Sequence, residues 1–173
     1  FPRLQMILVL ACDRATPGNR VSVDAEGRPV VHYRFTDAVA RSLARGTRAS
    51  ARIFFGAGAL RVHAPLARPP EFHATEWERI DDRIRAEHFL PGTIPVSAAH
   101  LMGGCGMGGS AADSVTDAWG RVHGLPWLRV ADSSLFPDAL QINPYLTVMA
   151  LADRAAQAIR QDAGALLDGS GAA

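Results

Sequence analysis

The chain has 173 residues, of which 48% are hydrophobic and 20% are charged, and this composition is typical of a globular protein with one substantial core. Its eighteen basic residues are all arginines, and they are interspersed with seventeen acidic residues, so the chain has a net charge of +1. The arginines form no basic stripe that would bind a nucleic-acid backbone. The sequence has only two cysteines, far apart, so neither a disulfide framework nor a zinc site is indicated. No apolar run reaches the roughly eighteen residues of a transmembrane segment, and a cytoplasmic location is favoured.

The first third of the sequence has apolar runs and turn residues in a pattern typical of a β-sheet. The apolar run MILVLAC at residues 6–12 predicts a buried strand, and the TPGN sequence that follows predicts a turn. Two β-rich runs on either side of Glu26 and Gly27 then predict an antiparallel hairpin. We therefore expect neighbouring antiparallel strands in this region.

A long helix is predicted after the hairpin. Thr36 and Asp37 offer an N-cap, and the segment DAVARSLARGTRASARIFF carries apolar residues at helical spacing until Gly56 and Gly58 end it. Further along, LRVHAP predicts a short strand and PLARPPEF a linker. The segment TEWERIDDRIRAEH predicts a charged helix capped by Thr75.

After Leu90 the sequence becomes rich in small residues and loses any periodic apolar pattern. Here PGTIPVSAAH leads into the glycine cluster HLMGGCGMGG at residues 100–109. We take this as the start of a second structural part. An apolar strand at residues 127–131 stops at Asp132, and INPYLTVMALADRAAQAIRQ predicts the final helix, followed by a frayed tail at residues 166–173. The apolar face of that helix consists of Val148, Leu151, Ala152, Ala155 and Ile159.

The start of the final helix has two interpretations. Asn143 occupies a capping position and Pro144 the first helical position, where the missing N–H is not needed. A strand that ends in Asp132, a loop, and a helix N-terminus with free N–H groups would together favour negative charge. Since capping by asparagine is common, the segment is also explained as an ordinary helix start.

The glycine cluster and the histidine before it form a second candidate. Glycine permits positive φ and lets the backbone lie against a flat ligand, and His100 can supply a proton-accepting imidazole near neutral pH. A flexible surface loop and a structural histidine are the competing interpretations. The glycines concerned are Gly103, Gly104, Gly106, Gly108 and Gly109.

Other catalytic arrangements are missing from the sequence. There is no GxSxG nucleophile elbow, no HExxH and no GxxxxGK[ST]. A hydrolase with His100 as base would need a nucleophile, and Ser97 lies too close in sequence with no elbow around it. No metal site is predicted, because the remaining histidines stand singly, without ligand spacing to the cysteines: His32, His63, His73, His88 and His123.

Three stretches together resemble the C-terminal region of the glucose-methanol-choline (GMC) oxidoreductases, flavoenzymes that oxidise alcohols with FAD. They are SAAHLMGGCGMG, SVTDAWGRVHGLPWLRVADSSLFP and INPYLTVMALADRAAQAI, at residues 97–108, 114–137 and 142–159. The HxxGGC spelling and the asparagine of NPYLT are most similar to the branch with cholesterol oxidase and long-chain alcohol oxidases. The family's dinucleotide fingerprint, a GxGxxG after an N-terminal strand with an acidic residue further on, does not occur here.

This resemblance implies chemical roles for two residues. His100 matches the histidine that faces the flavin and takes, or helps to hold, the substrate hydroxyl proton. Asn143 matches the residue beside it that hydrogen-bonds the alcohol oxygen and the flavin edge; many other family members carry a second histidine there. The carbinol carbon would pass a hydride to flavin N5, so the implied function is that of an FAD-dependent alcohol oxidase or dehydrogenase.

The resemblance also implies a set of cofactor-binding residues besides Asn143. Asp132 and Ser133 match positions near the ribityl-diphosphate portion of FAD, and Pro144 and Tyr145 match positions that pack near the isoalloxazine. The glycines at the start of the cluster would let the backbone approach the cofactor; they are Gly103 and Gly104.

The implied fold is α/β, the C-terminal half of a two-domain flavoenzyme. Residues 1–95 would complete a substrate-binding domain built on an antiparallel sheet, and residues 96–165 would supply the last strand and helix of a Rossmann-like FAD-binding domain. The implied partners are an apolar alcohol and the missing N-terminal FAD-binding half, in the same chain or in a separate subunit. The alternative is a non-catalytic assembly subunit that completes a partner flavoprotein, although the retained His100 and Asn143 argue against it.

Overall fold

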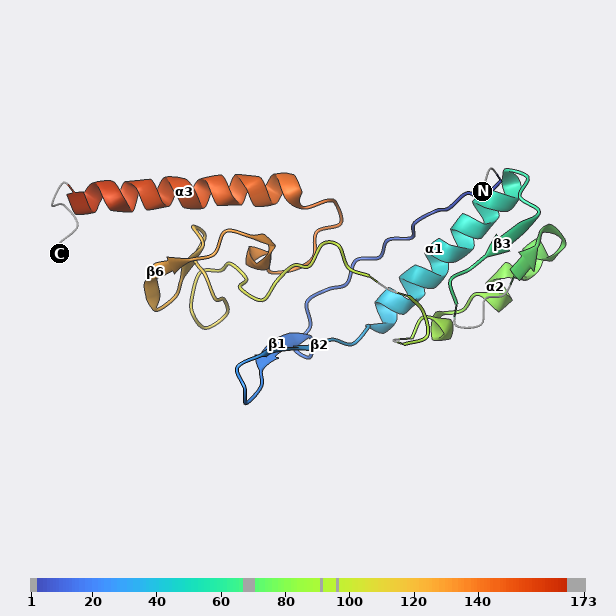
Figure 1. Ribbon diagram of the computed structural model, residues 1–173, viewed down its shortest axis with the longest axis horizontal. Helices are drawn as coiled ribbons and strands as arrows, with labels where there is room; N and C mark the ends of the chain where they lie inside the picture. Colours follow the sequence, from blue (N-terminus) through green and yellow to red (C-terminus); the bar gives the residue numbers. More distant parts are fainter. Residues whose placement is uncertain (1–2, 67–70, 91, 96, 168–173) are drawn as a thin grey trace. The chain divides into compact units, whose positions relative to one another are not determined.

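The computed structural model describes residues 3–66, 71–90, 92–95 and 97–167, and the chain divides into two units (Figure 1). The first unit consists of Phe1–Asp13 and Tyr33–Ser97, and the second of Arg14–His32 and Ala98–Ala173. The predicted hairpin therefore belongs with the C-terminal residues. The predicted tail at 166–173 lies almost entirely outside the described residues.

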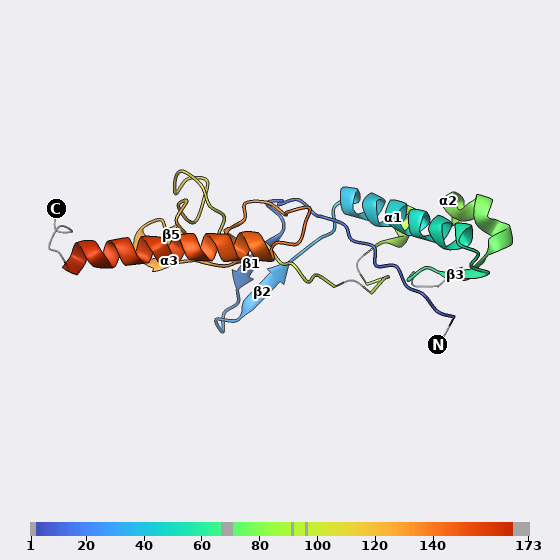
Figure 2. The same cartoon turned by 90° about the horizontal axis from the view of Figure 1, so that it is seen from above.

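The first unit is built around one long helix and one small antiparallel sheet (Figure 2). Its elements are α1 (Asp37–Gly56), β3 (Arg61–His63), β4 (Glu71–His73), η1 (Ala74–Arg79), α2 (Ile80–Arg83) and η2 (Ala86–His88). Strands β3 and β4 pair antiparallel with Val62 opposite Phe72. Helix α1 begins as predicted, because the Thr36 hydroxyl accepts a hydrogen bond from the Val39 N–H at 3.3 Å.

The predicted charged helix at residues 75–88 is wrong, since this segment forms η1, the four-residue α2 and η2 instead. The physical reason is the core of the unit, where Ile80, Ile84 and Phe89 are all buried together with Phe72. In one continuous helix Ile80 and Ile84 would share a face, but Phe89 would point away from it. The chain instead turns extended at Ile84, with φ −114° and ψ 92°, and Phe89 reaches the same core. The predicted linker also contains β4 at its end, and its residues 67–70 lie outside the described residues.

The predicted strand at residues 6–12 is also wrong: residues 4–16 have no regular secondary structure. A strand needs a hydrogen-bonded neighbour, and none of the strands in the described residues pairs with this segment. Most of its apolar side chains are exposed. The apolar run therefore identified a segment with strand character, but this structure supplies no partner for it.

The second unit contains two further antiparallel pairs and a long helix. Its elements are β1 (Arg20–Val23), β2 (Pro29–His32), β5 (Arg121–Val122), β6 (Leu125–Arg129), η3 (Ser133–Leu135) and α3 (Tyr145–Leu167). The β1–β2 hairpin is confirmed, with Val21 opposite Val31. The turn before it is tied to the rest of the unit, because the Ala15 N–H donates to the Asp138 carboxylate at 2.8 Å.

The fold class is confirmed in its coarse form, a mixture of helices and small antiparallel sheets. The described residues contain three two-stranded sheets. The predicted last strand of a Rossmann-like sheet is not seen as such, because β6 pairs antiparallel with β5. An antiparallel pair can be joined by a short turn, whereas the parallel strands of a Rossmann sheet need crossover connections.

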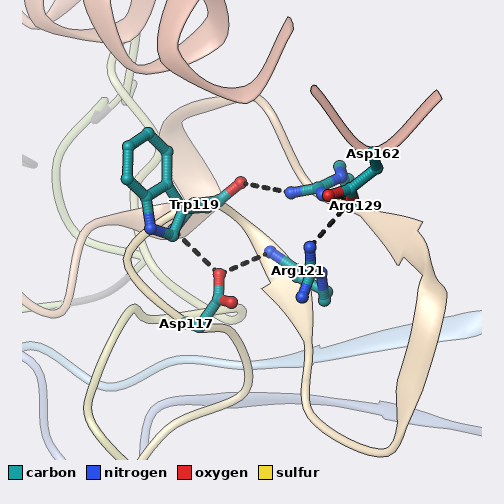
Figure 3. Close-up of polar contacts among 5 residues, drawn as sticks. All are labelled: Asp117, Trp119, Arg121, Arg129 and Asp162. Carbon is teal, nitrogen blue, oxygen red and sulfur yellow. Dashed lines mark hydrogen bonds and ion pairs between the residues drawn. The ribbon is translucent and has the colours of Figure 1, made fainter. Parts of the chain in front are cut away.

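Helix α3 is held along the β5–β6 hairpin by a cluster of charged groups (Figures 1 and 3). Arg121 donates to the Asp162 carboxylate at 2.8 Å, and Arg129 donates to the same oxygen. Arg129 also donates to the Trp119 carbonyl oxygen at 3.1 Å, and its side chain is only 9% exposed. The cluster thus connects the C-terminal part of α3 to the strand that leads to Asp132.

Burial alone would raise the pKa of Asp162, but the hydrogen bonds and positive charges of Arg129 and Arg121 outweigh it and hold that pKa below its ordinary value. The turn before β5 is fixed separately, because the Asp117 carboxylate accepts from the backbone N–H groups of Trp119 and Arg121 at 2.8 and 2.9 Å (Figure 3). The hairpin is therefore held by hydrogen bonds both at its base and at its contact with α3.

Candidate active site

Helix α3 begins one residue later than predicted. Its first residue is Tyr145, and the Pro144 carbonyl accepts the first helical hydrogen bond, from the Val148 N–H at 2.9 Å. The first N–H groups of the helix have no acceptor within it and carry partial positive charge. Within the described residues the side chain of Asn143 makes no hydrogen bond, so the structure shows no cap by Asn143.

The glycine segment is anchored to η3 through its backbone. The N–H groups of Gly103, Cys105 and Met107 donate to the carbonyl oxygens of Ser133, Ser134 and Leu135 at 3.2, 3.0 and 2.9 Å. The Ser133 hydroxyl adds a hydrogen bond of 2.7 Å to the Leu101 carbonyl. These contacts fix the position of His100 relative to Ser133.

The glycines leave space that is mostly filled by the chain itself. A Cβ on Gly103 would lie 3.6 Å from the Phe136 carbonyl oxygen, and a Cβ on Gly106 would lie 3.4 Å from the Pro137 Cα. Gly103 and Gly104 have φ values of +83° and +104°, and a Cβ on Gly104 would meet open space. Of the two glycines that the resemblance assigns to the cofactor, only Gly104 has no atom near the position of an added Cβ.

The spelling GCGMGG at residues 104–109 fits the letters of a dinucleotide-binding loop but not its context. Turns follow it, and the next described helix is the short η3. Such a loop works between a strand and a helix, whose N-terminus binds the phosphates. This segment is therefore not a dinucleotide loop.

Four predicted site residues line one open depression of about 440 Å³. They are His100, Ser133, Pro144 and Tyr145. The sequence interpretation missed the rest of the lining, which is apolar and consists of Ala98, Ala99, Leu101, Val148 and Met149. Spacing could have identified two of these, because Val148 and Met149 lie three and four residues after Tyr145 on the same face of α3.

The other predicted site residues lie outside this lining: Gly103, Gly104, Asp132 and Asn143. The Asp132 carboxylate has a hydrogen-bond partner close in sequence: it accepts from the Ser134 hydroxyl at 2.5 Å and from the Ser134 N–H at 2.8 Å. These two hydrogen bonds hold the pKa of Asp132 below its ordinary value, and the bond from the Ser134 hydroxyl has the larger effect. The carboxylate therefore caps η3 and carries negative charge at neutral pH.

The depression combines two chemical characters. Its surface is largely apolar, and Leu101, Tyr145 and Met149 are 74%, 62% and 63% exposed. The His100 imidazole is also exposed and makes no hydrogen bond within the described part of the chain. The site can therefore receive an apolar molecule beside a group that accepts a proton.

Two further properties concern the described residues as a whole. No three His, Cys, Asp or Glu side chains among them gather as metal ligands would. Neither α1, α3 nor any shorter described helix combines the length and apolar character of a membrane span.

Comparison with known proteins gives a family match and several relatives. The model of a family described as GMC oxidoreductase matches residues 17–152. The long-chain-alcohol oxidase FAO4A of Arabidopsis thaliana is 29% identical over 88% of this chain, and paromamine 6'-oxidase of Streptomyces fradiae is 43% identical over 38% of it. The oxygen-dependent choline dehydrogenase of Chromohalobacter salexigens is 49% identical over 37% of it. The matches cover only 21%, 12% and 11% of these three relatives.

Proposed function

The chain belongs to the GMC oxidoreductase family, and from that premise we propose that it carries the catalytic part of an FAD-dependent alcohol oxidoreductase, with His100 as the base. One observation carries this proposal: the His100 imidazole and the N-terminus of a long helix line the same apolar depression. Because the matches cover less than a quarter of the relatives, the complete enzyme is proposed to include an FAD-binding portion in the same chain or in a separate subunit.

The residues of the depression fit a flat, mostly apolar cofactor with a polar edge. Leu101, Tyr145 and Met149 offer exposed apolar surface, and the first N–H groups of α3 favour negative charge beside them. The open side of Gly104 leaves room for close approach of the backbone. When bound, FAD supplies the acceptor for the hydride that leaves the carbinol carbon.

His100 is proposed to take the proton of the substrate hydroxyl. A neutral imidazole accepts a proton near physiological pH, and general-base catalysis of this kind contributes about a hundred-fold or more to a rate. The hydrogen bonds between the glycine segment and η3 hold His100 in place through the backbone, so both ring nitrogens remain available to a substrate.

Asn143 is proposed to hold the alcohol oxygen from the neighbouring position. Its side-chain amide has two donor hydrogens and makes no hydrogen bond within the described residues. It directly precedes Pro144, which lines the depression, so it belongs to the same edge of the site. An amide donor at this point would orient the hydroxyl toward His100.

Ser133 and Asp132 are proposed to contact the polar portion of the cofactor. The Ser133 hydroxyl donates its hydrogen to the Leu101 carbonyl and keeps its acceptor capacity. Asp132 carries its charge at the end of the segment that leaves β6. Both residues lie on the chain stretch that also receives the backbone hydrogen bonds of the glycine segment.

The substrate is proposed to be an apolar alcohol. The lining of the depression is apolar apart from His100, Ser133 and the Tyr145 hydroxyl, so a long apolar chain would lose no hydrogen bonds there. The printed name of the Arabidopsis relative, a long-chain-alcohol oxidase, supports the same class. A sugar-like alcohol would leave several hydroxyls without partners against this surface.

The test is a visible absorption spectrum of the protein purified together with its FAD-binding portion, followed by anaerobic addition of alcohols of increasing chain length. We expect flavin absorption that bleaches on addition of alcohol, with greater effect for apolar chains. A preparation that retains flavin but does not bleach with any alcohol would refute the proposed reaction.

A non-catalytic assembly subunit remains the second candidate, because the matches cover only a small share of each relative. In that case the flavoprotein would keep its turnover when His100 is replaced by alanine. The comparison of His100→Ala with the unaltered chain therefore separates the two functions.

A further inference from the structure

Met102 lies two residues after His100 and makes a polar contact with a segment far away in the sequence. The Leu140 N–H donates a hydrogen bond to the Met102 Sδ at 3.3 Å. A thioether sulfur can only accept a hydrogen bond, so a backbone N–H is a suitable partner for it. Met102 is half-buried and lies outside the lining of the depression, so it would act on the site through the chain and not by touching a substrate.

Leu140 is the last residue before Asn143 whose backbone has a hydrogen bond. Gln141, Ile142 and Asn143 make none within the described residues. On the other side, the carbonyl of the buried Pro144 accepts the first hydrogen bond of α3. Three residues of chain span at most about 11 Å, so the place of Leu140 limits where Asn143 can lie.

The backbone that carries Met102 is itself fixed. The Ser133 hydroxyl donates to the Leu101 carbonyl at 2.7 Å, and the Gly103 N–H donates to the Ser133 carbonyl at 3.2 Å. One serine therefore holds the backbone on both sides of Met102. Because that backbone continues directly into His100, the Met102 sulfur connects the chain at His100 to the chain that leads into α3.

We propose that Met102 is a positioning residue: its hydrogen bond from the Leu140 N–H sets the distance between the proposed base and the amide that holds the alcohol. This inference rests on the proposed function, in which His100 and Asn143 act on the same hydroxyl group. A misplacement of about 1 Å in such a pair can cost about a hundred-fold in rate. One hydrogen bond between their two segments can therefore affect the reaction without contacting the alcohol.

The test compares three variants of the complete flavoprotein by stopped-flow measurement of flavin reduction at a saturating concentration of alcohol. Met102→Leu conserves side-chain volume but removes the acceptor, and we expect reduction to slow at least about ten-fold. Met102→Gln supplies an acceptor again, its amide carbonyl, and should bring the rate to within about three-fold of the unaltered protein. Met107→Leu is the matched control, because the Met107 sulfur makes no hydrogen bond within the described residues, and its rate should be unchanged.

Two further measurements separate positioning from a purely structural role. Met102→Leu should leave the midpoint of thermal unfolding nearly unchanged, because exchange of methionine for leucine conserves volume. Amide hydrogen exchange at Leu140 should be at least about ten-fold faster in Met102→Leu and unchanged in Met107→Leu. This exchange is measured without alcohol, so it does not depend on activity.

The opposite results overturn the proposal. Equal reduction rates for Met102→Leu and Met107→Leu would show that the sulfur does not position the site. Equal slowing in Met102→Leu and Met102→Gln, or slowing matched by a loss of stability, would assign the effect to packing. Unchanged exchange at Leu140 would remove the hydrogen bond itself. Failure of the proposed function is recognised separately, because no alcohol would then reduce the unaltered flavoprotein, and the positioning role would fall with it.

Discussion

Among the described glycines of the second unit, Gly120 is the one where an added methyl group would meet the closest atom. Its φ is +73°, and an added Cβ would lie 2.2 Å from the Val130 carbonyl oxygen. The Val130 N–H in turn donates to the Gly120 carbonyl at 2.8 Å, so the two backbones are in direct contact. Gly120→Ala must therefore displace the chain that leads from β6 to Asp132.

The expected loss of stability can be worked out from these contacts. A left-handed backbone costs a non-glycine residue roughly 1–2 kcal/mol, and disturbing the Val130 hydrogen bond costs about 1 kcal/mol more. The reduced entropy of the unfolded chain returns roughly 0.4–1 kcal/mol. We expect Gly120→Ala to lower the free energy of unfolding by about 2 kcal/mol.

Gly124 provides the matched control, because it has a similar φ of +78° but a Cβ there would meet no atom within 4 Å. Gly124→Ala should therefore cost only about 1 kcal/mol. Urea unfolding of both variants, followed by circular dichroism, measures the difference. Equal losses would refute the close approach of Gly120 to Val130, on which the placement of Asp132 depends.

Three further predictions concern the site and the helix that carries it. His100→Ala should slow flavin reduction by roughly a hundred-fold or more without changing the unfolding midpoint, measured by stopped-flow absorbance and thermal unfolding; unchanged reduction would remove His100 from the mechanism. Asn143→Ala should also slow reduction but leave stability nearly unchanged, since its side chain makes no hydrogen bond in the described residues; a loss of about 1 kcal/mol would instead indicate a helix cap. Asp162→Asn should lower the midpoint of thermal unfolding at pH 7. Because the pKa of Asp162 is lowered in the folded protein, the difference in midpoint between the variant and the unaltered chain should shrink as the pH falls below about 4. A difference that persists at pH 2 would contradict the ion pairs with Arg121 and Arg129.

Local signals in the sequence predicted the elements that depend on their own residues. Helix α1 follows from Thr36 and the helical spacing after it, and the β1–β2 hairpin follows from the turn at Glu26 and Gly27. In both cases the hydrogen bonds that define the element join residues close in sequence. These elements needed no information from the rest of the chain.

The failed predictions depend on contacts between distant residues. The segment at 75–88 has helical composition, but the chain turns extended at Ile84, which lets Phe89 reach the core that Ile80 and Ile84 share. The strand at residues 6–12 needs a neighbour that local sequence cannot specify. Propensity is a weak preference, and tertiary packing overrides it at both places.

The candidate site could be predicted only in part for the same reason. The residue types at His100 and Asn143 stand out in sequence, and the resemblance to a family assigned roles to them. The apolar lining could not be predicted, because Ala98 and Met149 are separated by fifty residues of chain and meet only in the folded unit. Asp132 also has a local partner, Ser134, that its spacing did not reveal.

The division of the chain has a consequence for how the second unit forms. Arg14–His32 belongs to it together with Ala98–Ala173, so residues 33–97 leave the unit and return to it. The hairpin can join the unit only after this long loop closes, and the entropic cost of closure grows with loop length, about 0.6 kcal/mol for each doubling. Grafting the second unit onto a related enzyme therefore requires both pieces, since a cut at residue 98 would leave Asp138 without the Ala15 N–H that it binds.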